Sequence, residues 1–105
     1  MTLDEIDPEQ PVGTIAAVAV DGAPMAAIRT AAGWVLTEDR CPHAQCPFTD
    51  DGELADDGTL ICNCHGSEFD PLTGELLLGP ATTGLSVIRL KVERNRLNFE
   101  SRWTS

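Results

Sequence analysis

The segment CPHAQCPFTDDGELADDGTLICNCHGSEFD, residues 41–70, contains all four cysteines and both histidines of the chain. Four of the six form two short pairs: Cys41 and His43 are separated by one residue, and Cys62 and His65 by two. Thiolates and imidazoles are common ligands of zinc and of iron–sulfur irons. Because eighteen residues lie between the pairs, each pair is expected on its own loop, where it supplies one thiolate and one imidazole.

Three metal chemistries use such residues. Finger-type and ribbon-type zinc sites usually open with C-x(2–4)-C, whereas the first pair here is C-x-H. A c-type haem needs C-x-x-C-H, and ICNCH, residues 61–65, has one residue between its cysteines. In a Rieske [2Fe–2S] centre, two cysteines hold one iron and two histidines hold the other. The spacing sets the haem aside and leaves a Rieske centre and structural zinc as the two candidates.

Composition limits the class of partner. The chain has 105 residues, which indicates one small domain. Its 17 acidic and 7 basic residues give a formal net charge of −10. Nucleic acids and anionic membranes would repel such a protein, so the charge favours a basic protein partner.

The sequence also predicts the compartment. It contains no apolar run long enough to cross a membrane. Its first residues, MTLDEIDPEQP, are acidic and lack the basic and apolar regions of a secretory signal. We therefore expect a cytoplasmic protein, in which clustered cysteines are more typical of metal ligands than of a disulfide framework.

Short β-like runs dominate both ends of the chain. The Asp21-Gly22 step between apolar runs is typical of a β-hairpin. The apolar phase slips between Val87 and Ile88, as at a β-bulge. The strands expected from these patterns are residues 13–20, 24–30, 34–38, 85–92 and 96–100, with a polar turn at 93–95.

The segment between these runs has a different character. Residues 41–80 are rich in Gly, Pro, Asp and Cys and show little periodicity. We therefore expect an all-β fold, a single domain of residues 1–105. A small antiparallel β-sandwich base of about residues 12–40 and 81–101 would carry an inserted, loop-rich cluster-binding subdomain of about residues 41–80.

Three stretches resemble the Rieske family: CPH at residues 41–43, CNCHGSEFD at 62–70 and LTGELLLGPA at 72–81. The resemblance implies a Rieske fold and one [2Fe–2S] cluster per chain. It assigns the metal ligands as Cys41, His43, Cys62 and His65. It also places Gly79-Pro80 in a third loop, as the proline turn that covers the cluster.

The resemblance also gives the remaining cysteines a role. In Rieske proteins of cytochrome bc complexes a disulfide ties the two ligand loops together. The matching residues here are Cys46 and Cys64. A Cys46–Cys64 disulfide is therefore expected.

Two further positions are expected to tune the redox potential. Ser67 matches a serine that donates its hydroxyl to a bridging sulfide in bc-type members. Phe69 stands where high-potential members have a tyrosine that bonds a ligand sulfur. A lost hydrogen bond to a charged group is worth about 1.5–3 kcal/mol, or about 60–130 mV for one electron. The potential should therefore lie below that of quinol-oxidising relatives.

The expected function is one-electron transfer rather than catalysis. Ala44 stands where quinol-oxidising relatives often have leucine, which favours a soluble ferredoxin. A flavin-dependent reductase would load the cluster, and a terminal oxygenase such as an aromatic-ring dioxygenase would receive the electron at the exposed edge of His43 and His65. A carrier of this kind would be a monomer. Two alternatives are a small relay subunit of a larger oxidoreductase and a zinc-stabilised interaction module.

Overall fold

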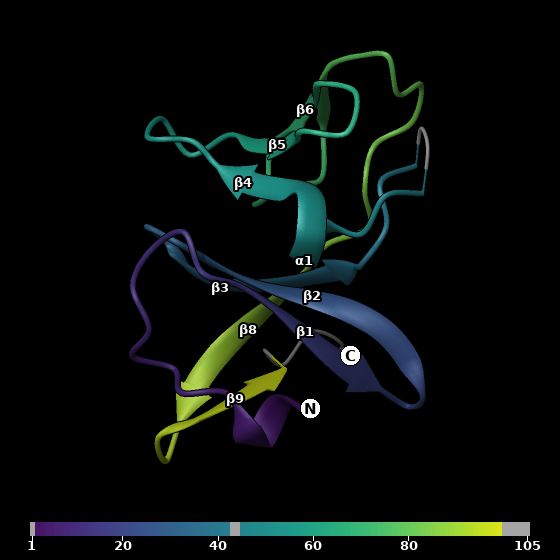
Figure 1. Ribbon diagram of the computed structural model, residues 1–105. Coiled ribbons are helices and arrows are strands. Elements are labelled where there is room, and N and C mark those ends of the chain that lie inside the picture. Colours follow the sequence, from purple (N-terminus) through teal and green to yellow (C-terminus); the bar gives the residue numbers. More distant parts are fainter. Residues whose placement is uncertain (1, 43–44, 100–105) are drawn as a thin grey trace, which may run out of the picture.

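The computed structural model describes residues 2–42 and 45–99 (Figure 1). Strands dominate the described part, and they fall into two antiparallel sheets. The elements are η1 (Leu3–Glu5), β1 (Ile15–Val20), β2 (Ala23–Thr30), β3 (Gly33–Glu38), α1 (Phe48–Asp51), β4 (Gly52–Leu54), β5 (Leu60–Cys62), β6 (Ser67–Phe69), β7 (Leu76–Leu78), β8 (Ile88–Glu93) and β9 (Arg96–Phe99).

Two-residue turns with positive φ at both positions close two of the hairpins in the first sheet. Asp21-Gly22 joins β1 to β2, as the sequence predicted, and both turn residues have positive φ, 52° and 83°. Arg94-Asn95 joins β8 to β9 with φ of 54° and 63°. A turn with two left-handed residues matches the right-handed twist of paired strands, so these turns fix the register of both hairpins.

The first sheet has the strand order β1-β2-β3-β8-β9 and is buried on both faces at its centre. Alternate side chains of β2 and β3 point to opposite faces. One set, Ala26, Ile28 and Val35, packs toward the second sheet. The other set, Ala27, Trp34 and Leu36, packs against Leu90, Leu97 and the N-terminal segment. The Trp34 indole N–H donates to the Pro8 carbonyl at 3.0 Å, which ties that segment to the sheet.

One part of the strand prediction is wrong. The strand expected to begin at Leu85 begins at Ile88, and the register irregularity lies between Glu68 and Phe69 instead of at the Val87–Ile88 step. Val87 packs into the core between the sheets, whereas Leu90 packs on the other face of the first sheet. The shift in the apolar pattern between Val87 and Ile88 therefore marks the point where the loop ends and β8 begins.

The second sheet has the order β4-β5-β6-β7 and lies entirely within residues 52–78 (Figure 1). A core of buried side chains, which includes Phe48 of α1 and Leu60 and Phe69 of the second sheet, separates the second sheet from the first. Gly74 approaches the returning chain so closely that a Cβ there would overlap the Leu85 carbonyl. Its φ of 83° also favours glycine. Among the described residues, no helix is both long and apolar enough to span a bilayer.

Candidate metal centre

Two loops with the same backbone turn carry the predicted ligands. In the first loop the Gln45 N–H donates to the Cys41 carbonyl at 2.7 Å. In the second the Gly66 N–H donates to the Cys62 carbonyl at 2.8 Å. Both donor residues have positive φ, 63° and 85°. Each loop therefore begins with a cysteine whose carbonyl accepts from the N–H of the residue four positions later. His43 and Ala44 lie outside the described residues.

Both of these cysteines are free thiols buried in the core. Cys41 and Cys62 are each 1% exposed. Burial raises the pKa of the Cys62 thiol, the backbone N–H groups of Cys64 and His65 lower it, and the neighbouring Cys41 side chain raises it. The Cys62 thiol, buried beside a second thiol, therefore resists ionisation unless a cation neutralises its thiolate. A bound metal supplies that charge and deprotonates its thiol ligands.

Hydrogen bonds hold the chain on either side of the loops. The Asp39 carboxylate accepts from the Thr49 N–H at 2.9 Å and from its hydroxyl at 2.7 Å, which joins the end of β3 to α1. The Asn63 N–H donates to the Asp51 carbonyl at 2.8 Å, and its side-chain amide donates to Glu53 at 2.9 Å. The loops therefore extend from a fixed frame.

A disulfide joins the two loops, as expected. Cys46 and Cys64 are bonded, with their Cα atoms 6.4 Å apart. Their sulfurs and a ring nitrogen of His65 lie within 4.8 Å of one another. Disulfide sulfurs are not thiolates, so this trio is a poor metal site. It shows instead that the exposed His65 stands beside the disulfide, whereas the Cys62 thiol is buried.

The inner face of the second sheet continues the site. Ser67 on β6 is the cross-strand partner of Cys62, so their side chains are neighbours on one face. Ser67 is fully buried, and its hydroxyl oxygen accepts from the Ala81 N–H at 3.0 Å. This bond leaves the hydroxyl hydrogen free to donate. It also fixes the chain directly after Pro80 against the second loop.

Phe69 lies two residues further along the same face. It is fully buried and meets Phe48 edge-on, with ring centroids 6.1 Å apart. The side chain therefore packs the core that also contains Cys41 and Cys62. As a phenylalanine it offers that core no hydrogen-bond donor.

The described residues fit a metal group held by soft ligands. They bring together two buried thiols, an exposed imidazole and a buried hydroxyl with an uncommitted hydrogen. Thiolate ligands select zinc or iron–sulfur groups, so the donor set alone leaves both open.

The comparisons with known proteins decide between them. A family model described as the Rieske [2Fe-2S] domain matches residues 3–89. The chain belongs to the Rieske [2Fe–2S] family. Proteins of this family bind a [2Fe–2S] cluster, so the family assignment favours an iron–sulfur cluster over zinc. It also identifies the two-sheet architecture as the Rieske fold.

Relatives and solved structures agree with this assignment. The chain is 35% identical over 78 residues to the 3-phenylpropionate/cinnamic acid dioxygenase ferredoxin subunit of Shigella flexneri serotype 5b (strain 8401), covering 73% of each chain. A chain in a complex of reduced oxygenase and oxidized ferredoxin in carbazole 1,9a-dioxygenase has a TM-score of 0.75 at 30% identity, over 88% of this chain and 93% of that one. The carbazole 1,9a-dioxygenase ferredoxin of Nocardioides aromaticivorans IC177 shares the fold, with a TM-score of 0.74 at 21% identity, over 92% and 89%.

Sequence reasoning missed two positions in this Rieske site. Ala81 supplies the N–H that orients Ser67, and Gln45 occupies the left-handed position of the first turn. Ala81 acts through its backbone, so its side chain gave no signal. The glycine of the second turn, Gly66, was visible in the sequence, but its counterpart Gln45 is not a residue type that marks such a turn.

Proposed function

We propose that this Rieske protein is a ferredoxin, which carries single electrons from a reductase to a terminal oxygenase and has no catalytic step of its own. The relatives described above are ferredoxin subunits of dioxygenases, which supports this role. The observation that carries it in the structure is the asymmetry of the second loop. Cys62 is buried in the core, and His65, three residues later, is exposed. Such a loop holds a redox group against the core and leaves one edge open to a partner.

We propose Cys41, His43, Cys62 and His65 as the cluster ligands. The free, buried state of both cysteines supports their half of the set. When bound, a [2Fe–2S] cluster with this ligation accepts and releases one electron, and neutral imidazoles raise its potential above that of all-thiolate clusters. The core around Cys41 and Cys62 excludes water from the thiolates. Ser67 supplies a hydroxyl beside them, and Gly79-Pro80 forms the covering turn.

Iron and acid-labile sulfide analysis of the purified protein tests the cofactor. Two irons and two sulfides per chain are expected, and zinc without sulfide would refute the ferredoxin role. Nitrogen couplings in pulsed paramagnetic resonance spectra of the reduced protein test the ligands. His65→Cys should remove one of two imidazole couplings, and His65→Cys spectra identical to native would exclude His65.

The partners and the organisation of the chain are also part of the proposal. A flavin-dependent reductase and an oxygenase with basic docking surfaces would bind a monomeric carrier in the cytoplasm. Size-exclusion chromatography of native extracts separates a free carrier from a permanent relay subunit, and cell fractionation tests the compartment. We further propose that residues 1–105 form one domain, with residues 41–80 inserted between 12–40 and 81–101. The confinement of the second sheet to residues 52–78 supports this division.

A further inference from the structure

The charges of this chain are separated along the sequence. Residues 41–80 contain eight Asp and Glu residues and no Lys or Arg. Residues 89–96, on the β8–β9 hairpin, contain four of the seven Lys and Arg residues, with Glu93 as their one acidic neighbour. The net charge of −10 is the total for the whole chain, and the local charge of each of these two segments differs from it.

The acidic segment 41–80 and the basic hairpin also lie apart in space, although η1, with its exposed Asp4 and Glu5, packs against β9 at the hairpin end. The second sheet and the cysteine loops lie at one end of the molecule, and the β8–β9 hairpin lies at the other (Figure 1). The molecule measures 39 × 30 × 25 Å. Since the Debye length at physiological salt is about 8 Å, each end presents its own local charge to an approaching protein.

The outer face of the second sheet carries a mixed row of side chains. Strand register pairs Glu53 with Ile61, Ile61 with Glu68, and Glu68 with Leu78. Two carboxylates thus alternate with two apolar side chains across four strands, and Leu78 is 55% exposed. We call these four residues the outer row. It lies on the opposite side of the strands from Cys62 and Ser67, next to the loop that carries His65.

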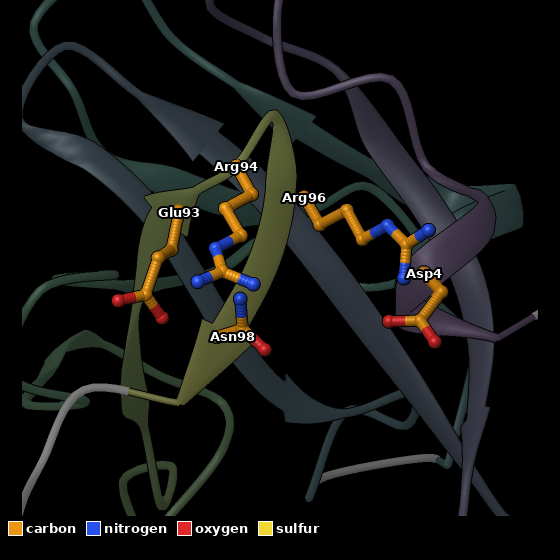
Figure 2. Close-up of a pocket in the computed structure, with 5 residues that line it drawn as sticks. All are labelled: Asp4, Glu93, Arg94, Arg96 and Asn98. Carbon is orange, nitrogen blue, oxygen red and sulfur yellow. The ribbon is translucent and has the colours of Figure 1, made fainter.

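The hairpin end differs in that it carries basic side chains. Arg89, Lys91, Arg94 and Arg96 are all exposed. Figure 2 shows Arg94 lying over the hairpin beside Asn98, and Arg96 extending away from the hairpin toward Asp4. Among the described residues, no carboxylate lies within ion-pair distance of either guanidinium. Because η1 packs against β9, the exposed Asp4 and Glu5 also lie at this end, which therefore carries charges of both signs.

We propose that the outer row is the docking surface for a basic redox partner, which would meet basic side chains mixed with acidic ones at the hairpin end. The inference rests on the proposed carrier role. The half-buried Ile61 between two carboxylates and the exposed Leu78 at the end of the row resemble the mixture of apolar and polar side chains in protein interfaces. Charge complementarity at such a surface fixes the orientation of the encounter and raises its rate. A partner seated there would meet the edge of His65.

A matched pair of double variants tests the surface. Glu53→Gln with Glu68→Gln removes two charges from the outer row, and Asp4→Asn with Glu93→Gln removes two from the hairpin end. Both variants change the net charge from −10 to −8. Stopped-flow mixing of the reduced protein with ferric cytochrome c, a basic acceptor, measures transfer of one electron from the cluster to the haem. The measured potential of each variant corrects for driving force.

The outer-row variant should react about two- to five-fold more slowly at low salt, and this difference should vanish near 1 M salt, where the Debye length is about 3 Å. The hairpin-end variant should react no more slowly than the native protein. Equal slowing of both variants, or slowing of neither, would overturn the proposal. Failure of the native protein to reduce cytochrome c at any salt would instead refute the carrier role.

Carbodiimide cross-linking reports the orientation without electron transfer. In the native complex with cytochrome c, cross-links should form at Glu53 and Glu68 and be absent from Asp4 and Glu93. Arg94→Gln with Arg96→Gln should allow cross-links at the hairpin end. Native cross-links as frequent at Asp4 and Glu93 as on the outer row would overturn the proposal.

Discussion

Removing the Ser67 hydroxyl should change two measurable properties through two different hydrogen bonds. The first bond, from the Ala81 N–H, is seen in the structure at 3.0 Å. Ser67→Ala leaves this N–H unpaired, and Ala81 is only 5% exposed. A buried unsatisfied donor costs about 1–3 kcal/mol, so the free energy of unfolding should fall by that amount.

The second bond is the one that the hydroxyl hydrogen can make. Ser67 stands beside Cys62 on the inner face, and no acceptor for its hydrogen is found among the described residues. A bond to the negatively charged cluster is worth about 1.5–3 kcal/mol. If it belongs wholly to the reduced form, its loss lowers the potential by about 60–130 mV.

Protein-film voltammetry and chemical denaturation measure these effects separately. Ser67→Thr is the control because it keeps the hydroxyl and adds a methyl group at a fully buried position. Overpacking should lower its stability by about 1–3 kcal/mol and leave its potential close to native. An unchanged potential in Ser67→Ala, with native iron and sulfide content, would refute the hydrogen bond to the cluster.

Three other substitutions test the site and its support. Phe69→Tyr places a hydroxyl beside the buried thiols and should raise the potential by about 60–130 mV; voltammetry showing no rise would contradict the assigned role of this position. Cys46→Ser with Cys64→Ser opens an 18-residue span, and urea titration should show a loss of stability below about 3 kcal/mol, because the core already joins the loops. The unsubstituted chain provides a second check. If it shows four reactive thiols when it is unfolded without a reducing agent, this disulfide is absent in solution. Trp34→Phe leaves the Pro8 carbonyl without its donor and should lower the free energy of unfolding by about 1–3 kcal/mol without changing the potential; a shifted potential would mean that the base and the site are coupled.

The parts of this fold that follow from local chemistry were predictable from sequence. The Asp21-Gly22 step predicted a hairpin because few residue pairs readily take positive φ at both positions of a two-residue turn. The C-x-H and C-x-x-H spacings pointed to a metal centre because the ligand chemistry is specific. Tertiary contacts were not predictable in the same way. The strand start at Ile88 depends on Val87 packing against the other sheet, which no local pattern reveals. The Ser67–Ala81 bond depends equally on the path of the third loop.

The period-two alternation of β5 and β6 separates two properties that a carrier must control. Cys62 and Ser67 face the core, where, with the proposed ligands, their contacts would set the stability of each redox state. Ile61 and Glu68 face outward, where their contacts set the association with a partner. Because neighbouring residues point to opposite faces, a substitution at one position changes one property with little steric effect on the other. Outward substitutions should therefore change the salt dependence of electron transfer at nearly constant potential, whereas inward substitutions should change the potential at nearly constant salt dependence. If Glu68→Gln shifted the redox potential as much as Ser67→Ala does, the alternation of the strand would not separate control of the potential from control of partner association.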